Sequence, residues 1–130
     1  MKDNHPILFE GLHSTYFLSH PDLKTRIKIV RTHNVEHEYY RNLYEVEGNQ
    51  FNKQYFRMES KKLKRYEDVL VNASAIAAIS PDDYKYFSKK FLNTYYIPAF
   101  HFHNKIEIKE GFGEYVLYHG NLSVNENIQA

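Results

Sequence analysis

The chain has 130 residues, a formal net charge of +1 and 42% apolar residues, which fits one globular domain. The near-neutral charge argues against nucleic acid as the main partner, because binding to a phosphate backbone needs an excess of cations. The chain contains no cysteine, which excludes disulfides, thiolate metal sites and a cysteine nucleophile, and is compatible with a cytoplasmic location.

Short apolar and β-branched runs predict strands over residues 6–9, 26–31, 75–79 and 94–97. Helical patterns between them predict helices over residues 12–18, 36–47, 51–73 and 80–91. A polar linker at 101–113 and a last strand at 114–119 are predicted to follow. This alternation predicts an α/β fold with a Rossmann-like parallel sheet and right-handed crossovers.

Two of these segments carry stronger signals. The run at 75–79 is almost wholly apolar, which is typical of a central parallel strand covered on both faces. Ser80 is then predicted to cap the next helix, with Pro81 in its first turn.

Polar residues follow the predicted strands, and ligands of open α/β sheets bind at the carboxyl ends of strands. The candidate site residues are Glu10, Gly11, His13, Thr32, His33, Asn34 and Ser80, with residues 98–101 after the fourth strand. His33 is the strongest candidate, because an imidazole at this edge can bond a phosphate or a hydroxyl. Packing at the strand end explains His33 equally well, and the ordinary polarity of loops explains His13 better.

Residues 33–37 match the H-x-x-E-H motif of inverted zinc metallopeptidases. That chemistry needs His33 and His37 one turn apart on a helix, with Glu36 as general base. Here His33 is predicted at a strand end and His37 in the first turn of a helix. A zinc hydrolase is therefore the least favoured function.

The long predicted helix has two features of interest. Cations recur at spacings of three and four residues, at Lys53, Arg57, Lys61, Lys64 and Arg65. Such a stripe suits the anionic inner face of a membrane, although a solvated outer face is the simpler explanation. Glu59 falls inside the apolar stripe of the same helix, where a carboxylate needs a partner or a raised pKa.

Four segments taken in order resemble those of the retaining GT-B glycosyltransferases of family 4 (group 1 type). They are Lys-Ile-Val-Arg-Thr-His-Asn at 28–34, Ala-Ser-Ala-Ile-Ala-Ala-Ile-Ser at 73–80, Tyr-Tyr-Ile-Pro at 95–98 and Tyr-His-Gly-Asn-Leu-Ser at 118–123. The resemblance covers most of the chain from Pro6 onward. It implies the second half of a GT-B N-terminal domain at 1–100, a linker at 101–113 and the start of a truncated donor-binding domain at 114–130.

The resemblance also implies an activity. A sugar would pass from a nucleotide-sugar to a glycan, polysaccharide or lipid-linked acceptor with retention, without a metal or a further cofactor. His33 would contact the donor phosphate or the transferred sugar, and Glu10 and Gly11 would line the same cleft. Gly120 and Asn121 fall in the donor-phosphate region, where the family has an Arg in place of Asn121.

The chain begins almost directly with a strand and ends soon after one, which indicates a portion of a longer enzyme. We therefore expect the 130 residues to be inactive alone. The free edge of the first strand predicts a homodimer. The main alternative to an enzyme is a non-catalytic α/β interaction module.

Overall fold

A computed structural model describes residues 4–100, 105 and 111–115 of the chain. All the helices and strands of these residues belong to one compact unit that ends at Ala99. In chain order they are β1 (Ile7–Glu10), the 3-10 helices η1 (Leu12–Phe17) and η2 (Pro21–Leu23), β2 (Lys28–Thr32), α1 (Glu36–Val46), α2 (Gln50–Tyr66), the 3-10 helix η3 (Glu67–Asn72), β3 (Ala75–Ala78), α3 (Pro81–Ser88) and β4 (Thr94–Tyr96).

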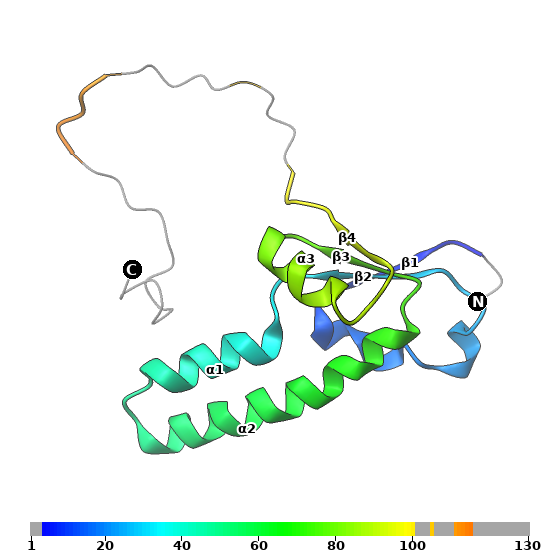
Figure 1. The fold of residues 1–130 in the computed structure, drawn as a ribbon, viewed down its shortest axis with the longest axis horizontal. Coiled ribbons are helices and arrows are strands. Elements are labelled where there is room, and N and C mark those ends of the chain that lie inside the picture. Colours follow the sequence, from blue (N-terminus) through cyan, green and yellow to red (C-terminus); the bar gives the residue numbers. More distant parts are fainter. Residues whose placement is uncertain (1–3, 101–104, 106–110, 116–130) are drawn as a thin grey trace. The chain divides into compact units, whose positions relative to one another are not determined.

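The four strands form one parallel sheet in the order β1-β2-β3-β4 (Figure 1). The register pairs Phe9 with Val30, Val30 with Ile76 and Ile76 with Thr94, so these residues form one row across the sheet. The predicted α/β fold with a Rossmann-like parallel sheet is confirmed. The apolar strand at 75–79 indeed lies inside the sheet, as β3.

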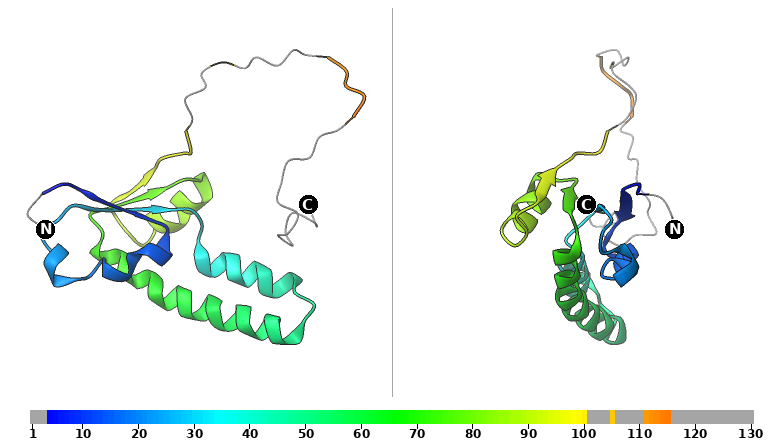
Figure 2. Two further views of the ribbon diagram at one scale, coloured as in Figure 1. Left: turned by 180° about the vertical axis from the view of Figure 1, so that it is seen from behind. Right: turned by 90° about the vertical axis from the view of Figure 1, so that its right-hand side faces the viewer.

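The described helices lie on one face of the sheet (Figure 2). The strands follow one another across the sheet in a single direction. Right-handed crossovers then place every connecting helix on the same face. The core packs against that face and comprises Phe9, Leu12, Leu18, Val30, Val35, Leu63, Leu70, Ile76, Ala78 and Phe87. On the opposite face Leu8 remains 56% exposed and Tyr95 likewise. Within β3 itself, Ile76, Ala77 and Ala78 are all buried, so the strand is enclosed on both sides as its apolar sequence predicts, and the exposed residues of the open face belong to β1 and β4.

Helices α1 and α2 form a hairpin that projects from the sheet, and they pack chiefly against each other (Figure 1). The side chain of Asn49 caps α2 by accepting hydrogen bonds from the N–H groups of Phe51 and Asn52, at 2.9 and 3.3 Å. An Asn at this position satisfies amides that have no partner inside the helix.

The single helix expected over 51–73 is wrong at its end, because α2 stops at Tyr66 and the chain tightens into η3. The tightening brings the chain to the start of β3. There the N–H of Ser74 donates to the carbonyl of Lys28 at 2.7 Å, and the hydroxyl of Ser74 accepts from the N–H of Lys28 at 3.0 Å. These two bonds fix where β3 joins β2.

The start of α3 is as predicted. The hydroxyl of Ser80 accepts a hydrogen bond from the N–H of Asp83 at 3.0 Å, and Pro81 occupies the first turn. The α-helix ends at Ser88, before the predicted residue 91.

Several predictions concern residues 101–104, 106–110 and 116–130, which lie outside the described part of the chain. They include most of the linker, most of the strand at 114–119, and Gly120 and Asn121. Within the described residues, no helix has both the length and the apolar character that a membrane crossing requires.

Candidate functional site

The carboxyl edge of β1 and β2 gathers three charged or polar side chains. Nε2 of His33 donates a hydrogen bond to Oε2 of Glu10 at 2.8 Å, and Nη1 of Arg31 lies 3.6 Å from Oε1 of the same carboxylate. All three side chains are partly open to solvent, at 46% for His33 and Glu10 and 31% for Arg31. The hydrogen bond from His33 lowers the pKa of Glu10 and outweighs the opposing effect of desolvation, and the charge of Arg31 lowers the pKa further.

Arg31 is a member of this cluster that the sequence interpretation missed. It is the register partner of Glu10 in the β1–β2 pair. Alternate residues of a strand share one face of the sheet. The spacing of two between Arg31 and His33 could therefore have predicted that both side chains lie on the same face.

The backbone turns sharply where β1 ends. Gly11 adopts φ 76° and ψ 162°, a conformation that is essentially reserved for glycine. Its N–H donates to the carbonyl of Arg31 at 2.8 Å, which extends the pairing of the two strands by one bond. The turn leads directly into η1, which carries His13.

His13 forms a second histidine–carboxylate pair, with Glu36. Its Nε2 lies 3.4 Å from Oε2 of Glu36, the first residue of α1. The imidazole is 61% exposed, whereas the carboxylate of Glu36 is 11% exposed. The predicted site residue His13 is thus anchored at the start of a helix and open on its outer side.

A hollow of about 250 Å³ adjoins this pair between η1 and α2. Its lining residues are His13, Glu59, Lys62, Leu63 and Tyr66. Nζ of Lys62 donates to Oε1 of Glu59 at 2.6 Å. Lys62 is therefore the partner that the sequence led us to expect for this carboxylate. The mixture of imidazole, ion pair, phenol and leucine suits a ligand with both polar and apolar parts.

The other predicted residues stand apart from this edge cluster. Thr32 is 2% exposed, with its hydroxyl 3.5 Å from the carbonyl of Ala77, so its side chain faces the interior. The hydroxyl of Ser80 is engaged as the cap of α3. Asn34 is exposed between β2 and α1.

The side chains of the H-x-x-E-H segment point to three different partners. His33 bonds Glu10, Glu36 lies beside His13, and His37 lies beside Glu67. His33 follows the end of β2 and His37 is the second residue of α1, as predicted. No group of three histidine, aspartate or glutamate side chains in the described residues is arranged to hold a metal ion.

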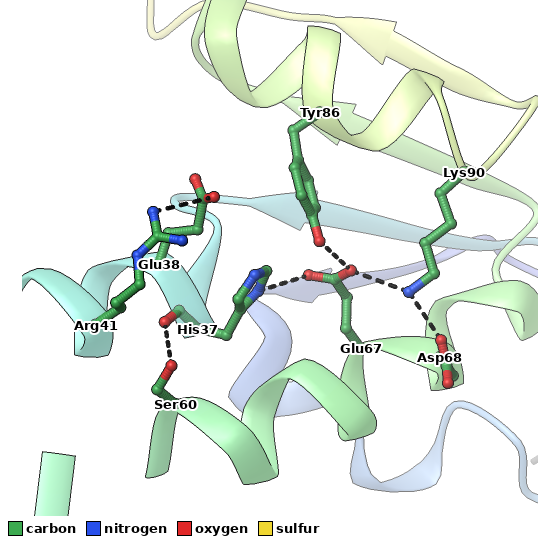
Figure 3. A network of polar contacts seen from close by, with 8 residues as sticks. All are labelled: His37, Glu38, Arg41, Ser60, Glu67, Asp68, Tyr86 and Lys90. Atoms are coloured by element: carbon green, nitrogen blue, oxygen red, sulfur yellow. Dashed lines mark hydrogen bonds and ion pairs between the residues drawn. The ribbon is translucent and has the colours of Figure 1, made fainter. Parts of the chain in front are cut away.

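A second polar cluster is buried beneath the sheet (Figure 3). The carboxylate of Glu67 is 1% exposed and accepts hydrogen bonds at Oε1 from the hydroxyl of Tyr86 at 2.9 Å and from Nζ of Lys90 at 3.2 Å. Nδ1 of His37 lies 3.4 Å from Oε2, without the alignment of a hydrogen bond. Lys90 also pairs with the exposed Asp68 at 2.8 Å.

This buried cluster joins elements that are distant in the sequence. His37 comes from α1, Glu67 from η3 and Tyr86 from α3, and the hydroxyl of Ser60 in α2 donates to the carbonyl of His37 at 2.7 Å. Burial lowers the pKa of His37, although the negative charge of Glu67 opposes the shift. Burial, with the hydrogen bond to Glu67, raises the pKa of Tyr86. Because the cluster is enclosed and joins α1, η3 and α3, we interpret its role as structural.

In comparisons with family models, curated proteins and solved structures, no match to this chain emerges.

Proposed function

We propose that the chain is part of a retaining glycosyltransferase whose sheet edge contacts a nucleotide-sugar. The supporting observation is the convergence of Glu10, Arg31 and His33 at the carboxyl edge of two neighbouring parallel strands. Open α/β sheets bind their ligands at this edge. The acceptor would be a glycan, a polysaccharide or a lipid-linked sugar.

The chemistry of the three groups suits a sugar that carries phosphate. The ionised carboxylate of Glu10 accepts hydrogen bonds from sugar hydroxyls. The guanidinium of Arg31 and the imidazole of His33 donate to phosphate oxygens, and the guanidinium does so as a pair of parallel bonds. In this proposal the nucleotide-sugar is a substrate, and no separate cofactor takes part.

The hollow beside His13 is the place proposed for the acceptor. Its ion pair between Glu59 and Lys62 offers both an acceptor and a donor of hydrogen bonds, and Leu63 offers an apolar contact.

The test is an NMR titration of the 130-residue chain with common nucleotide-sugars, inorganic pyrophosphate and short saccharides. We expect a donor to shift the signals of Glu10 and His33, and the His33→Ala variant to lose most of that binding. The matched control is His20→Ala, because His20 also lies near a carboxylate, Asp22 at 3.8 Å, but belongs to the turn before η2. If the His33→Ala variant shows the same signal shifts as the unchanged chain, the donor does not bind at His33 and the proposal is contradicted.

Turnover supplies an independent check. Part of the cleft would lie on a donor-binding domain, so the isolated chain is expected to bind a donor weakly through Glu10, Arg31 and His33 without transferring its sugar. Sugar transfer by the purified 130 residues would contradict this form of the proposal.

The open face of the sheet favours a second candidate, a non-catalytic α/β interaction module. Leu8 and Tyr95 are each 56% exposed on the face away from the described helices. Self-association through this face or through the edge strand β1 would appear as a concentration-dependent dimer in sedimentation. Leu8→Lys should abolish such a dimer, and a strictly monomeric chain would count against it.

A further inference from the structure

The outer side of α2 carries a stripe of apolar side chains in contact with solvent. Phe51 is 88% exposed, Met58 64% and Tyr55 53%. Their spacings of four and three residues align them along one side of the helix. These exposed fractions show that the described residues leave this side of α2 uncovered.

A row of cations runs beside this apolar stripe. It consists of the exposed Arg57, Lys61, Lys64 and Arg65. Within the described part of the chain, no ion pair engages Arg57, Lys61, Lys64 or Arg65. Lys53 lies over the ring of Tyr44, 5.1 Å from its centre.

Carboxylates are excluded from this outer side. The sequence of α2 holds one acidic residue, Glu59, which is 20% exposed and neutralised by Lys62. The acidic residues of the hairpin instead fall on α1 and the turn, at Glu36, Glu38, Glu45 and Glu47. The apolar stripe and the cation row are together called the basic–apolar face.

We infer that the basic–apolar face rests on an anionic lipid bilayer, with the cations among the headgroups and Phe51, Tyr55 and Met58 in the interfacial layer. Helices that lie in this plane combine Lys and Arg on one side with aromatic and aliphatic residues on the next. The cytoplasmic leaflet attracts such cations, and the amphipathic ring of Tyr55 suits the boundary between headgroups and acyl chains. This inference does not depend on the glycosyltransferase proposal.

A lipid surface fits this face better than a nucleic acid does. Phosphate backbones attract Lys and Arg, but they offer no apolar layer to Phe51 and Met58. The whole chain also has a net charge of only +1, so the attraction is confined to one helix.

The absence of tryptophan from the chain permits a direct test. Phe51→Trp introduces a single fluorophore at the exposed start of α2. We expect its emission to shift to shorter wavelength with vesicles of phosphatidylcholine and phosphatidylserine, and to be quenched by lipids brominated on their acyl chains. The matched control is Tyr16→Trp, because Tyr16 is 77% exposed but lies on η1, outside α2. The same shift at position 16 would overturn the inference.

Charge removal tests the other half of the face by vesicle sedimentation. Lys61→Gln combined with Arg65→Gln should weaken binding roughly fivefold for each charge, and added salt should weaken it further. The control pair, Lys24→Gln with Lys89→Gln, removes two exposed cations outside α2 and should leave binding unchanged.

The apolar half has its own readout. Met58→Ser should weaken binding several-fold and preserve the salt dependence, because it removes buried area and no charge. All the substituted side chains are exposed, so the variants should fold, and circular dichroism of each variant is the check. Equal loss in the control pair, no sedimentation with anionic vesicles, or binding to single-stranded RNA alone would each overturn the inference.

Discussion

The carboxylate of Glu10 accepts a hydrogen bond of 2.8 Å from Nε2 of His33, although 23 positions separate the two residues. The parallel pairing of β1 with β2 produces this contact, because it brings the two carboxyl ends to the same edge. The pair is half open to solvent, so its groups remain accessible to a ligand.

Removing the imidazole should change the titration of its partner. In His33→Ala the pKa of Glu10 is expected to rise toward its ordinary value of 4.5, because the hydrogen bond that most strongly stabilises the carboxylate is lost. Arg31→Gln should raise the same pKa by a smaller amount. Carbon-detected NMR of the Glu10 side chain against pH measures both. A larger rise in the Arg31 variant would reverse this ranking.

The backbone of Gly11 makes a prediction about stability. Gly11→Ala should lower the free energy of unfolding by about 1–3 kcal/mol, because φ 76° with ψ 162° strains any residue that has a Cβ. Contacts with more distant described residues add no further cost, since an added Cβ would meet none of their atoms within 4 Å.

Gly48 supplies the matched control for this change. An added Cβ there is equally unobstructed, but the backbone lies outside the positive-φ region. Gly48→Ala should therefore be neutral or stabilising by up to about 1 kcal/mol in urea denaturation. Equal destabilisation of both variants would show that φ is not the cause.

The buried carboxylate of Glu67 is expected to be the most sensitive polar group of the cluster in Figure 3. Glu67→Ala should cost about 1–3 kcal/mol, because it leaves the hydroxyl of Tyr86 without its buried acceptor, while the partly exposed Lys90 keeps Asp68. Asp68→Ala removes the exposed partner of the same lysine and should cost within about 1 kcal/mol. Similar losses in the two variants would contradict a dominant role for burial.

The pKa of His37 predicts how stability depends on pH. Burial lowers this pKa below the ordinary value of 6.5, so the unfolded chain binds a proton that the folded chain resists. The free energy of unfolding should therefore decrease as pH falls through about 6.5 toward the folded value. Urea denaturation between about pH 8 and pH 5 should show a shallower decrease in His37→Gln. An identical slope in the variant would place the dependence on other histidines.

The sequence predicted the parallel sheet and the start of α3 because both depend on local patterns. The apolar run of β3 and the Ser80-Pro81 helix start need no distant partner to be recognised. The end of α2 was not predictable in this way. Leu70 continues the helical spacing past Tyr66, and only the bonds of Ser74 to Lys28 show where the chain must turn.

The same distinction separates the site residues. His33 was identified from the rule on strand ends, and the alternation along β2 could have added Arg31. The helical pattern singled out Glu59 as a carboxylate that needs a partner. The structure shows that Glu67, at 1% exposure, is the more deeply buried carboxylate. Its partners Tyr86 and Lys90 lie 19 and 23 positions away, so no local pattern reveals the cluster.

The tertiary contacts of the α1–α2 hairpin differ between its two ends. The root is the end next to the sheet, and the tip is the turn at residues 47–49. The root is held by the bond of Ser60 to His37 and by the buried cluster, whereas the tip relies on local bonds such as that from the N–H of Asn49 to Glu47. Amides near the tip should therefore exchange with solvent through local opening, and those near the root only when the whole unit unfolds. The tip can consequently fray while the strand ends that carry Glu10 and His33 stay in place.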